Sequence, residues 1–331
     1  MPASALRLVF LGAEQLNTWG ASTKAPTVKM MGITDASLSV VDEVDQPELV
    51  GTLAPATVAE QIAQHGEGHI EQRASYQDIC YWLDGIFGPA TASAAVNTTY
   101  TYNYIAPITA STTPQHYTIN FGSTDAEYEM DGSLVTNLNV KAEAGQMWTV
   151  GVDLLGKVIG TAVMATCADR EVDLIASSDT TLYMDAWTCK TVGMTPASAT
   201  LIKAELTANP GRHLKTFVGS LTPQSYGESR WEGKLVTVLE YNSTAKALVD
   251  ALLAPGKVQR QFRLTSSEGT GTSKRICALD FAGTLVDGAK LFDDRDGNMT
   301  VSLTWNGTVN TVPTTDYWLK AKVTNDLSVL P

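Results

Sequence analysis

The stretch GQMWTVGVDLLGKV, residues 145–158, decides the fold because it has the period of a strand and recurs later in the chain. Large apolar residues from Trp148 to Leu154 alternate with small or polar ones, as they do in a half-buried β-strand. With one residue gapped, the stretch matches GNMTVSLTWNGTV, residues 297–309, in the order Gly, Met, Thr, Val, Gly, Val. The chain is therefore expected to contain the same glycine turn and strand twice.

Three further matches flank these two stretches and keep the same order along the chain. The pairs are VGTLAP (50–55) and VGSLTP (218–223), EGHI (67–70) and EGKL (232–235), and GSLV (132–135) and GTLV (283–286). Each match is weak by itself, but several in one order predict a tandem duplication.

Two segments, SYQDICYWLDGIFG from Ser75 and STAKALVDALLA from Ser243, have the period of a helix. Each places apolar residues on one stripe, as in a helix that lies on a core. The stripes are Ile79, Trp82, Leu83, Ile86 and Phe87 in the first segment, and Ala245, Leu248, Val249, Leu252 and Leu253 in the second. Ser75 with Asp78 resembles a capping box. Each run ends in a proline, so the helices belong to the repeat.

These patterns predict a mainly β protein with two tandem antiparallel β-barrel or sandwich domains, each with one flanking α-helix. The predicted division is an N-terminal arm or strand (1–35), a first domain (36–158), a connecting segment (159–198), a second domain (199–311) and a C-terminal segment (312–331). A chain with two copies of one fold suits rings with closed symmetry. The two terminal segments lie outside both copies and are expected to be ring-to-ring contacts or outer strands.

Composition indicates a folded chain of 331 residues, 44% hydrophobic and 18% charged, with a net charge of -12. Residues 1–158 hold 6 Lys and Arg against 17 Asp and Glu, net -11, whereas residues 159–331 hold 17 against 18, net -1. No basic face is evident, which argues against affinity for nucleic acid. The apolar runs are too short to cross a bilayer, so no membrane partner is expected.

Catalytic and cofactor motifs are missing from the sequence. There is no G-x-S-x-G, no P-loop lysine, and no Cys/His cluster of the kind that binds zinc. Paired carboxylates on a β-scaffold leave an inverting glycosidase as a remote alternative. We therefore expect no enzyme activity and no cofactor.

The stretch FDDRDGNMT, residues 292–300, contains a fragment of a calcium loop in Asp294, Asp296 and Asn298. Asn298 follows the glycine, however, and the downstream Glu of the calcium pattern is missing. Asp-Gly is also a strong hairpin signal, and the matching stretch VKAEAGQMW (140–148) keeps the glycine but only one acid. A hairpin tip is favoured, and an ion bound by the second copy alone stays open.

The order of these motifs resembles the tail tube (major tail) proteins of long-tailed bacteriophages, and most closely the branch with two tube domains in one chain. The likeness covers residues 36–311 and rests on VGTLAPA, the helix SYQDICYWLDGIFG, GSLVTNLNV, GQMWTVGVDLLGK and TLYMDAWTCKTVGMTPASATLIKAEL. It implies β-barrels in hexameric rings, or in trimeric rings of pseudo-sixfold symmetry when the domain is duplicated. The rings would stack into a tube for genome ejection.

The resemblance also implies an acidic lumen, along which DNA slides because like charges repel. The candidates for that lining lie on the segments before each predicted helix, and for each of them a simple solvent-facing position is the alternative. They are Glu67, Glu71, Glu228, Glu232 and Glu240. Implied partners are ring neighbours, stacked rings, and tape measure, terminator and distal tail proteins, in a virion tail assembled in the host cytoplasm. The alternative class is a secreted or surface β-sandwich that binds a partner or a sugar.

Overall fold

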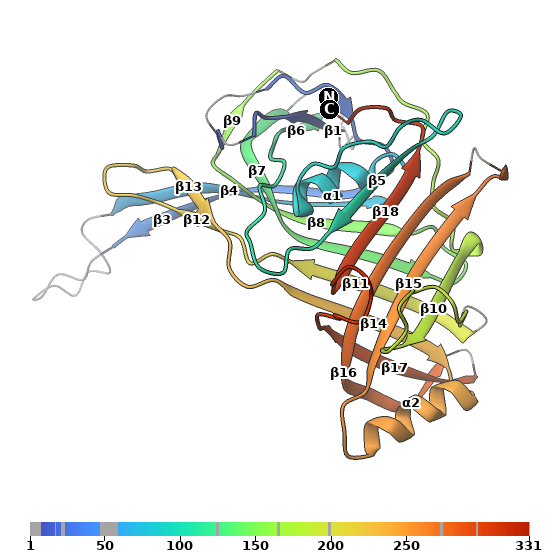
Figure 1. Ribbon diagram of the computed structural model, residues 1–331. Helices are drawn as coiled ribbons and strands as arrows, with labels where there is room; N and C mark the ends of the chain where they lie inside the picture. Colours follow the sequence, from blue (N-terminus) through green and yellow to red (C-terminus); the bar gives the residue numbers. More distant parts are fainter. Residues whose placement is uncertain are drawn as a thin grey trace, which may run out of the picture.

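The computed structural model describes residues 8–16, 18–20, 24–46, 59–123, 126–163, 166–197, 200–271, 274–295 and 297–330. Within these residues the chain is mainly antiparallel β-structure with two α-helices, as the sequence predicts (Figure 1). None of the helices in this part is long and apolar enough to cross a membrane.

The first half of the chain contains β1 (Leu8–Ala13), β2 (Val28–Lys29), β3 (Ile33–Asp45), β4 (Glu60–Arg73), α1 (Ile79–Phe87), β5 (Tyr100–Ile105), β6 (Tyr117–Ser123), β7 (Ala126–Glu143), β8 (Thr149–Gly156) and β9 (Val158–Thr161). The second half contains a 3-10 turn (Ser177–Asp179), β10 (Thr180–Ala186), β11 (Leu201–Asn209), β12 (His213–Lys215), β13 (Ser225–Gly227), β14 (Glu232–Glu240), α2 (Ser243–Leu253), β15 (Gln259–Glu268), β16 (Arg275–Arg295), β17 (Asn298–Gly307) and β18 (Leu319–Asn325).

The strand order shows the duplication directly. In the first copy β3 pairs with β4, β4 with β8, β8 with β7, and β7 with β6. In the second copy β11 pairs with β14, β14 with β17, β17 with β16, and β16 with β15. A helix follows β4 in one copy and β14 in the other. The predicted tandem architecture is therefore confirmed at the level of topology, while the domain boundaries stay a prediction.

The two copies share one sheet, which is the main difference from two separate barrels. β7 of the first copy pairs with β11 of the second, so a single 16-stranded sheet runs through both. β18 also joins the copies, because it pairs with β16 on one side and with β5 on the other. Figure 1 shows these long strands crossing the molecule, with the β3–β4 arm projecting beside the β12–β13 hairpin.

Strand register corrects two of the sequence matches. Thr149 lies opposite Lys141 in the β7–β8 hairpin, and Thr300 lies opposite Asp293 in the β16–β17 hairpin. These two pairs are taken as equivalent, as the match of residues 145–158 with 297–309 predicts. Counting along the strands from these pairs, Gly156 of β8 is equivalent to Gly307 of β17. Their neighbours on the next strand are Gly66 and Gly233, whereas the EGHI and EGKL match aligns Gly68 with Gly233, two residues away. The GSLV and GTLV match is offset by one residue at a β-bulge in both copies. A two-residue slip keeps the same face of a strand, so periodicity alone does not detect it.

The two helices lie where the sequence predicts, but α1 begins later than the expected cap at Ser75, at Ile79 with Asp78 in the N-cap position, and the two helices differ in burial. Ser75 Oγ accepts a hydrogen bond from the Asp78 N–H at 2.9 Å, which is the first half of a capping box. The Asn242 side chain caps α2 by accepting from two backbone N–H groups. All of α1 is buried, whereas only Ala245, Leu248 and Val249 of α2 are.

Candidate assembly interface

The junction between β7 and β11 carries a ladder of charges. Lys203 lies opposite Glu143, and Glu205 lies opposite Lys141. Along the strands, Nζ of Lys141 lies 2.6 Å from Oε2 of Glu143, and Nζ of Lys203 lies 2.6 Å from Oε2 of Glu205. Burial raises the pKa of Glu205, but hydrogen bonds from Lys203 and Asn139 outweigh it and lower the pKa. Opposite charges on facing strands stabilise this register.

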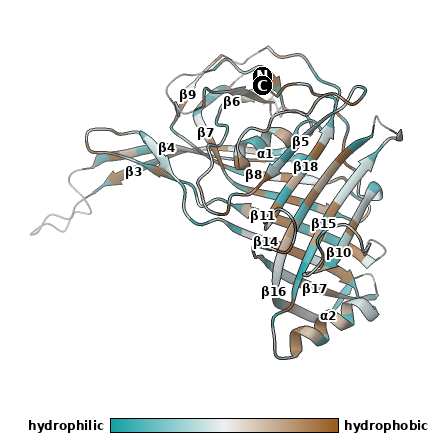
Figure 2. Cartoon of the chain, viewed as in Figure 1, coloured by the Kyte–Doolittle hydropathy of each residue, from teal (hydrophilic) through white to brown (hydrophobic). Residues whose placement is uncertain are grey.

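These residues belong to a polar face, which is the side of the shared sheet that points away from the core. Its members alternate along each strand with residues of the opposite, core-facing side, and Figure 2 shows hydrophilic and hydrophobic patches succeeding one another along these strands. The polar face includes Ser37, Ser39, Glu67, His69, Glu71, Asn137, Asn139, Lys141, Glu143, Asp153, Lys203, Glu205, Thr207, Lys234, Ser302 and Thr304. His69 Nδ1 lies 2.6 Å from Asp153 Oδ1, so acids and bases are interleaved here.

Four of the five predicted lining acids lie on strands of this face. Glu67 and Glu71 lie on β4, and Glu232 and Glu240 lie at the two ends of β14. Glu228 lies before β14 and accepts hydrogen bonds from the Thr112 N–H and from Trp231 Nε1. Sequence reasoning missed Glu143 and Glu205, because only the pairing of β7 with β11 brings them together. The role of all these acids in a lumen stays a prediction.

Two strand edges at the ends of the shared sheet have no partner within the described residues. β3 pairs with β4 alone, whereas its counterpart β11 pairs with both β14 and β7. In the described part of β16, residues after Thr284 pair with β17 on one side, whereas the equivalent part of β7 also pairs with β11. Each chain thus contains one complete junction, between β7 and β11. It also presents the two separate edges, on β3 and on β16, that a second junction of this kind would need.

The last turn of α1 lies over the β7–β11 junction and is covered by the second copy. Leu83 and Phe87 line one small apolar pocket with Leu206 and Ala208 of β11. The Phe87 ring also stacks on Trp231, with centroids 5.8 Å apart. This cover and the contacts of Tyr104 of β5 with Asp84 and Phe87 contribute to the complete burial of α1.

Arg212 fastens the end of α1 to the second copy. Its guanidinium donates to the carbonyl oxygens of Gly85, Ile86 and Val135 at 2.6, 2.6 and 2.7 Å. These carbonyls include the free ones at a helix C-terminus, where a cation is favoured. Burial lowers the pKa of Arg212 to about 10, which leaves it charged at neutral pH.

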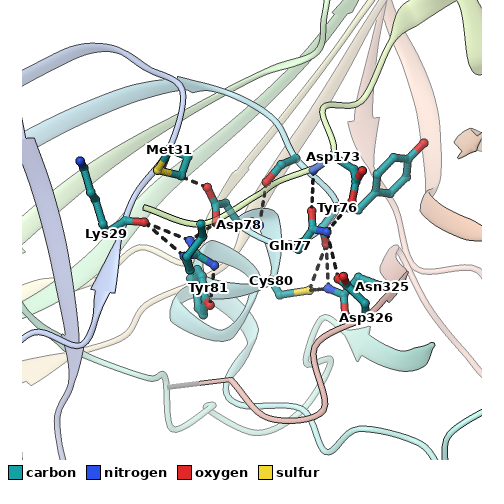
Figure 3. Close-up of polar contacts among 12 residues, drawn as sticks. Lys29, Met31, Tyr76, Gln77, Asp78, Cys80, Tyr81, Asp173, Asn325 and Asp326 are labelled. Carbon is teal, nitrogen blue, oxygen red and sulfur yellow. Dashed lines mark hydrogen bonds and ion pairs between the residues drawn. The ribbon is translucent and has the colours of Figure 1, made fainter. Parts of the chain in front are cut away.

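The turn that leads into α1 is held by three distant segments, as Figure 3 shows. Asp78 accepts hydrogen bonds from Arg170 and from the Met31 N–H. Gln77 Nε2 donates to Asp173 and to Asp326, at 2.7 and 2.9 Å. The helix is therefore fixed by the connecting and C-terminal segments as well as by the core.

The acidic stretch at residues 292–300 is the tip of the β16–β17 hairpin. Gly297 has a φ of 81°, and its N–H donates to Asp294 Oδ1 at 2.8 Å. Gly145, at the equivalent turn, has a φ of 76°. Among the described residues no group of three or more His, Cys, Asp or Glu is arranged to hold a metal, and Asp296 lies outside them. An ion at Asp294, Asp296 and Asn298 stays a hypothesis.

The fold and the β7–β11 junction place the chain in a class of β-sheet proteins in which a duplicated unit forms one continuous sheet. A family model for phage tail tube proteins matches residues 6–307, so the chain belongs to the phage tail tube protein family. It is a structural subunit of a virion tail, and its family self-assembles with other tail components. No curated protein matches the chain.

Proposed function

We propose that copies of this chain join head to tail, with β16 of one chain pairing with β3 of the next. The observation that carries this is the β7–β11 junction, since β16 corresponds to β7 and β3 corresponds to β11. An interface between two different surfaces of one chain produces a ring if the rotation closes. A trimer of chains then presents six copies of the unit, and a hexamer presents twelve.

The polar face lines the lumen of this ring, and stacked rings form the conduit for DNA ejection. Support comes from the acids that line β4 and β14 and from the ion pairs that neutralise Lys141 and Lys203. A surface of this kind offers phosphates few unpaired cations, so DNA passes without adhering. The tube assembles in the host cytoplasm with tape measure, terminator and distal tail proteins.

The register of the junction supplies the test. Lys141 lies opposite Glu205, and the equivalent positions are Asp293 and Ser37. Facing residues on antiparallel strands have Cα atoms about 4.5–5.5 Å apart, within reach of a disulfide. A mixture of Ser37→Cys chains and Asp293→Cys chains should therefore give cross-linked dimers of unlike chains, together with rings or tubes by negative-stain microscopy.

Asp287→Cys is the matched control, because it lies on the same strand about four positions out of register with Ser37. It should not cross-link to Ser37→Cys. Equal cross-linking of both pairs would show that the register is wrong. A protein that stays monomeric and unlinked at every concentration would overturn the ring proposal.

A further inference from the structure

The last turn of α2 exposes apolar side chains that the equivalent turn of α1 buries. Leu253 is 69% exposed, whereas Phe87 at the matching position is 7% exposed. The match follows from the stripes of the two helices and from the prolines that end them two residues later. Phe87 is buried because β11 lines the same apolar pocket and because the rings of Tyr104 and Trp231 pack on it, whereas no described strand pairs with β16 at the equivalent place near α2.

β3 exposes apolar side chains at two positions. The equivalent positions of β11, in the second copy, carry the side chains that pack near α1. Leu38 and Val40 correspond to Leu206 and Ala208, since Val40 and Ala208 each lie opposite a glycine at the same point of the sheet. Leu38 is half-buried and Val40 is 48% exposed. Leu206 and Ala208, in contrast, are buried against α1.

From these two surfaces we propose that the last turn of α2 in one chain packs on β3 of the next chain. Leu253 contacts Leu38 and Val40 there, just as Phe87 lines one apolar pocket with Leu206 and Ala208 within the chain. This rests on the proposed ring, and it adds an apolar layer beneath the pairing of β16 with β3. Figure 1 shows α2 at the end of the sheet opposite the β3–β4 arm, as a head-to-tail contact requires.

Side-chain volume supports the same partner. Within the chain a large Phe87 meets a small Ala208, and between chains a smaller Leu253 meets a larger Val40. Leu in place of Phe reduces the volume on the helix, and Val in place of Ala increases the volume on the strand. The two changes offset each other, which is the condition under which close packing tolerates substitution. A second copy of this chain is therefore a better occupant of the exposed turn than an unrelated protein.

A pair of size changes tests this contact. Leu253→Phe alone overfills the contact, and Val40→Ala alone leaves a cavity, so each should raise the concentration needed for assembly by about tenfold. The double variant recreates the pair found within the chain and should return assembly to the wild-type concentration. Both residues are exposed in the single chain, so the variants keep its fold. Independent effects of the two changes would overturn the proposed contact.

A charge on the same helix gives a second measurement. Leu253→Glu should prevent assembly, whereas Ala247→Glu, on a different exposed side of α2, should not. A mixture of Val40→Cys and Leu253→Cys chains should also form unlike dimers. If the Ser37 and Asp293 pair cross-links but this pair does not, and Leu253→Glu still assembles, the α2 contact is wrong and the ring stands. If wild-type protein never assembles, both proposals fail.

Discussion

Asp84 is a titratable carboxylic acid inside a buried helix. It lies in α1, 4% exposed, where its carboxylate accepts from the Tyr104 hydroxyl at 2.8 Å and from the Ala90 N–H at 3.2 Å. Burial raises the pKa of Asp84 to about 7, because two hydrogen bonds do not replace the water lost. The folded chain therefore holds a proton at pH values where the unfolded chain has released it. Stability falls as the pH rises from about 4 to about 7, and then levels off.

Asp84→Asn removes this dependence, because the amide stays neutral at every pH. Between pH 5 and pH 8 the variant should lose less free energy of unfolding than wild type, by on the order of 2 kcal/mol. Urea unfolding at the two pH values, below the assembly concentration, measures the difference. Asp316→Asn, which changes an exposed acid, should leave the wild-type pH dependence intact. Equal slopes for all three proteins would mean that Asp84 is ionised at little cost.

At the scale of single elements, the paired hairpins show why one glycine is kept in both copies. Gly145 and Gly297 have φ angles of 76° and 81°, in the left-handed region that disfavours other residues. A Cβ added to either would meet no atom within 4 Å, so only the backbone conformation opposes a side chain.

Gly145→Ala and Gly297→Ala should each lower the free energy of unfolding by about 1 kcal/mol. Gly160→Ala is the matched control, because a Cβ there also meets nothing within 4 Å but the φ is not positive. Urea unfolding of the three variants separates the two effects. Indistinguishable values for Gly145→Ala and Gly160→Ala would show that the turn imposes no strain.

The same elements show what the sequence could predict. The period of 3.6 predicts both helices and their stripes, and the period of two predicts β8, because these patterns are local. Asp84 and Gly85 lie outside the stripe of α1 but are buried, because Tyr104 of β5 packs against Asp84, and Val135 of β7 and Tyr117 of β6 fill the space at Gly85. The pairing of β7 with β11 was not predictable, because alternation identifies the buried face of a strand and not its neighbour. The ladder of Lys141, Glu143, Lys203 and Glu205 depends on that pairing.

For the whole molecule, where the charges lie matters more than the net charge of -12. Lys141 and Lys203 lie on the polar face, and each has a carboxylate oxygen 2.6 Å from its Nζ. An ammonium that is paired with a carboxylate has less to gain from a phosphate than a bare one. Glu143 and Glu205 would therefore act in the proposed lumen as shields of these two lysines, a different role from simple repulsion of DNA.

Removing the carboxylates of Glu143 and Glu205 should make the assembled protein bind DNA. In a Glu143→Gln, Glu205→Gln variant, two lysines in every chain become available to phosphates, and each phosphate contact adds about 0.9 to the slope of log affinity against log salt. Anisotropy of a labelled duplex, titrated with assembled protein at several salt concentrations, measures that slope. Glu268→Gln with Asp316→Asn makes the same change in net charge at exposed positions off the polar face. If both double variants bind alike, net charge governs DNA affinity; if neither binds more than wild type, these lysines do not face the DNA path.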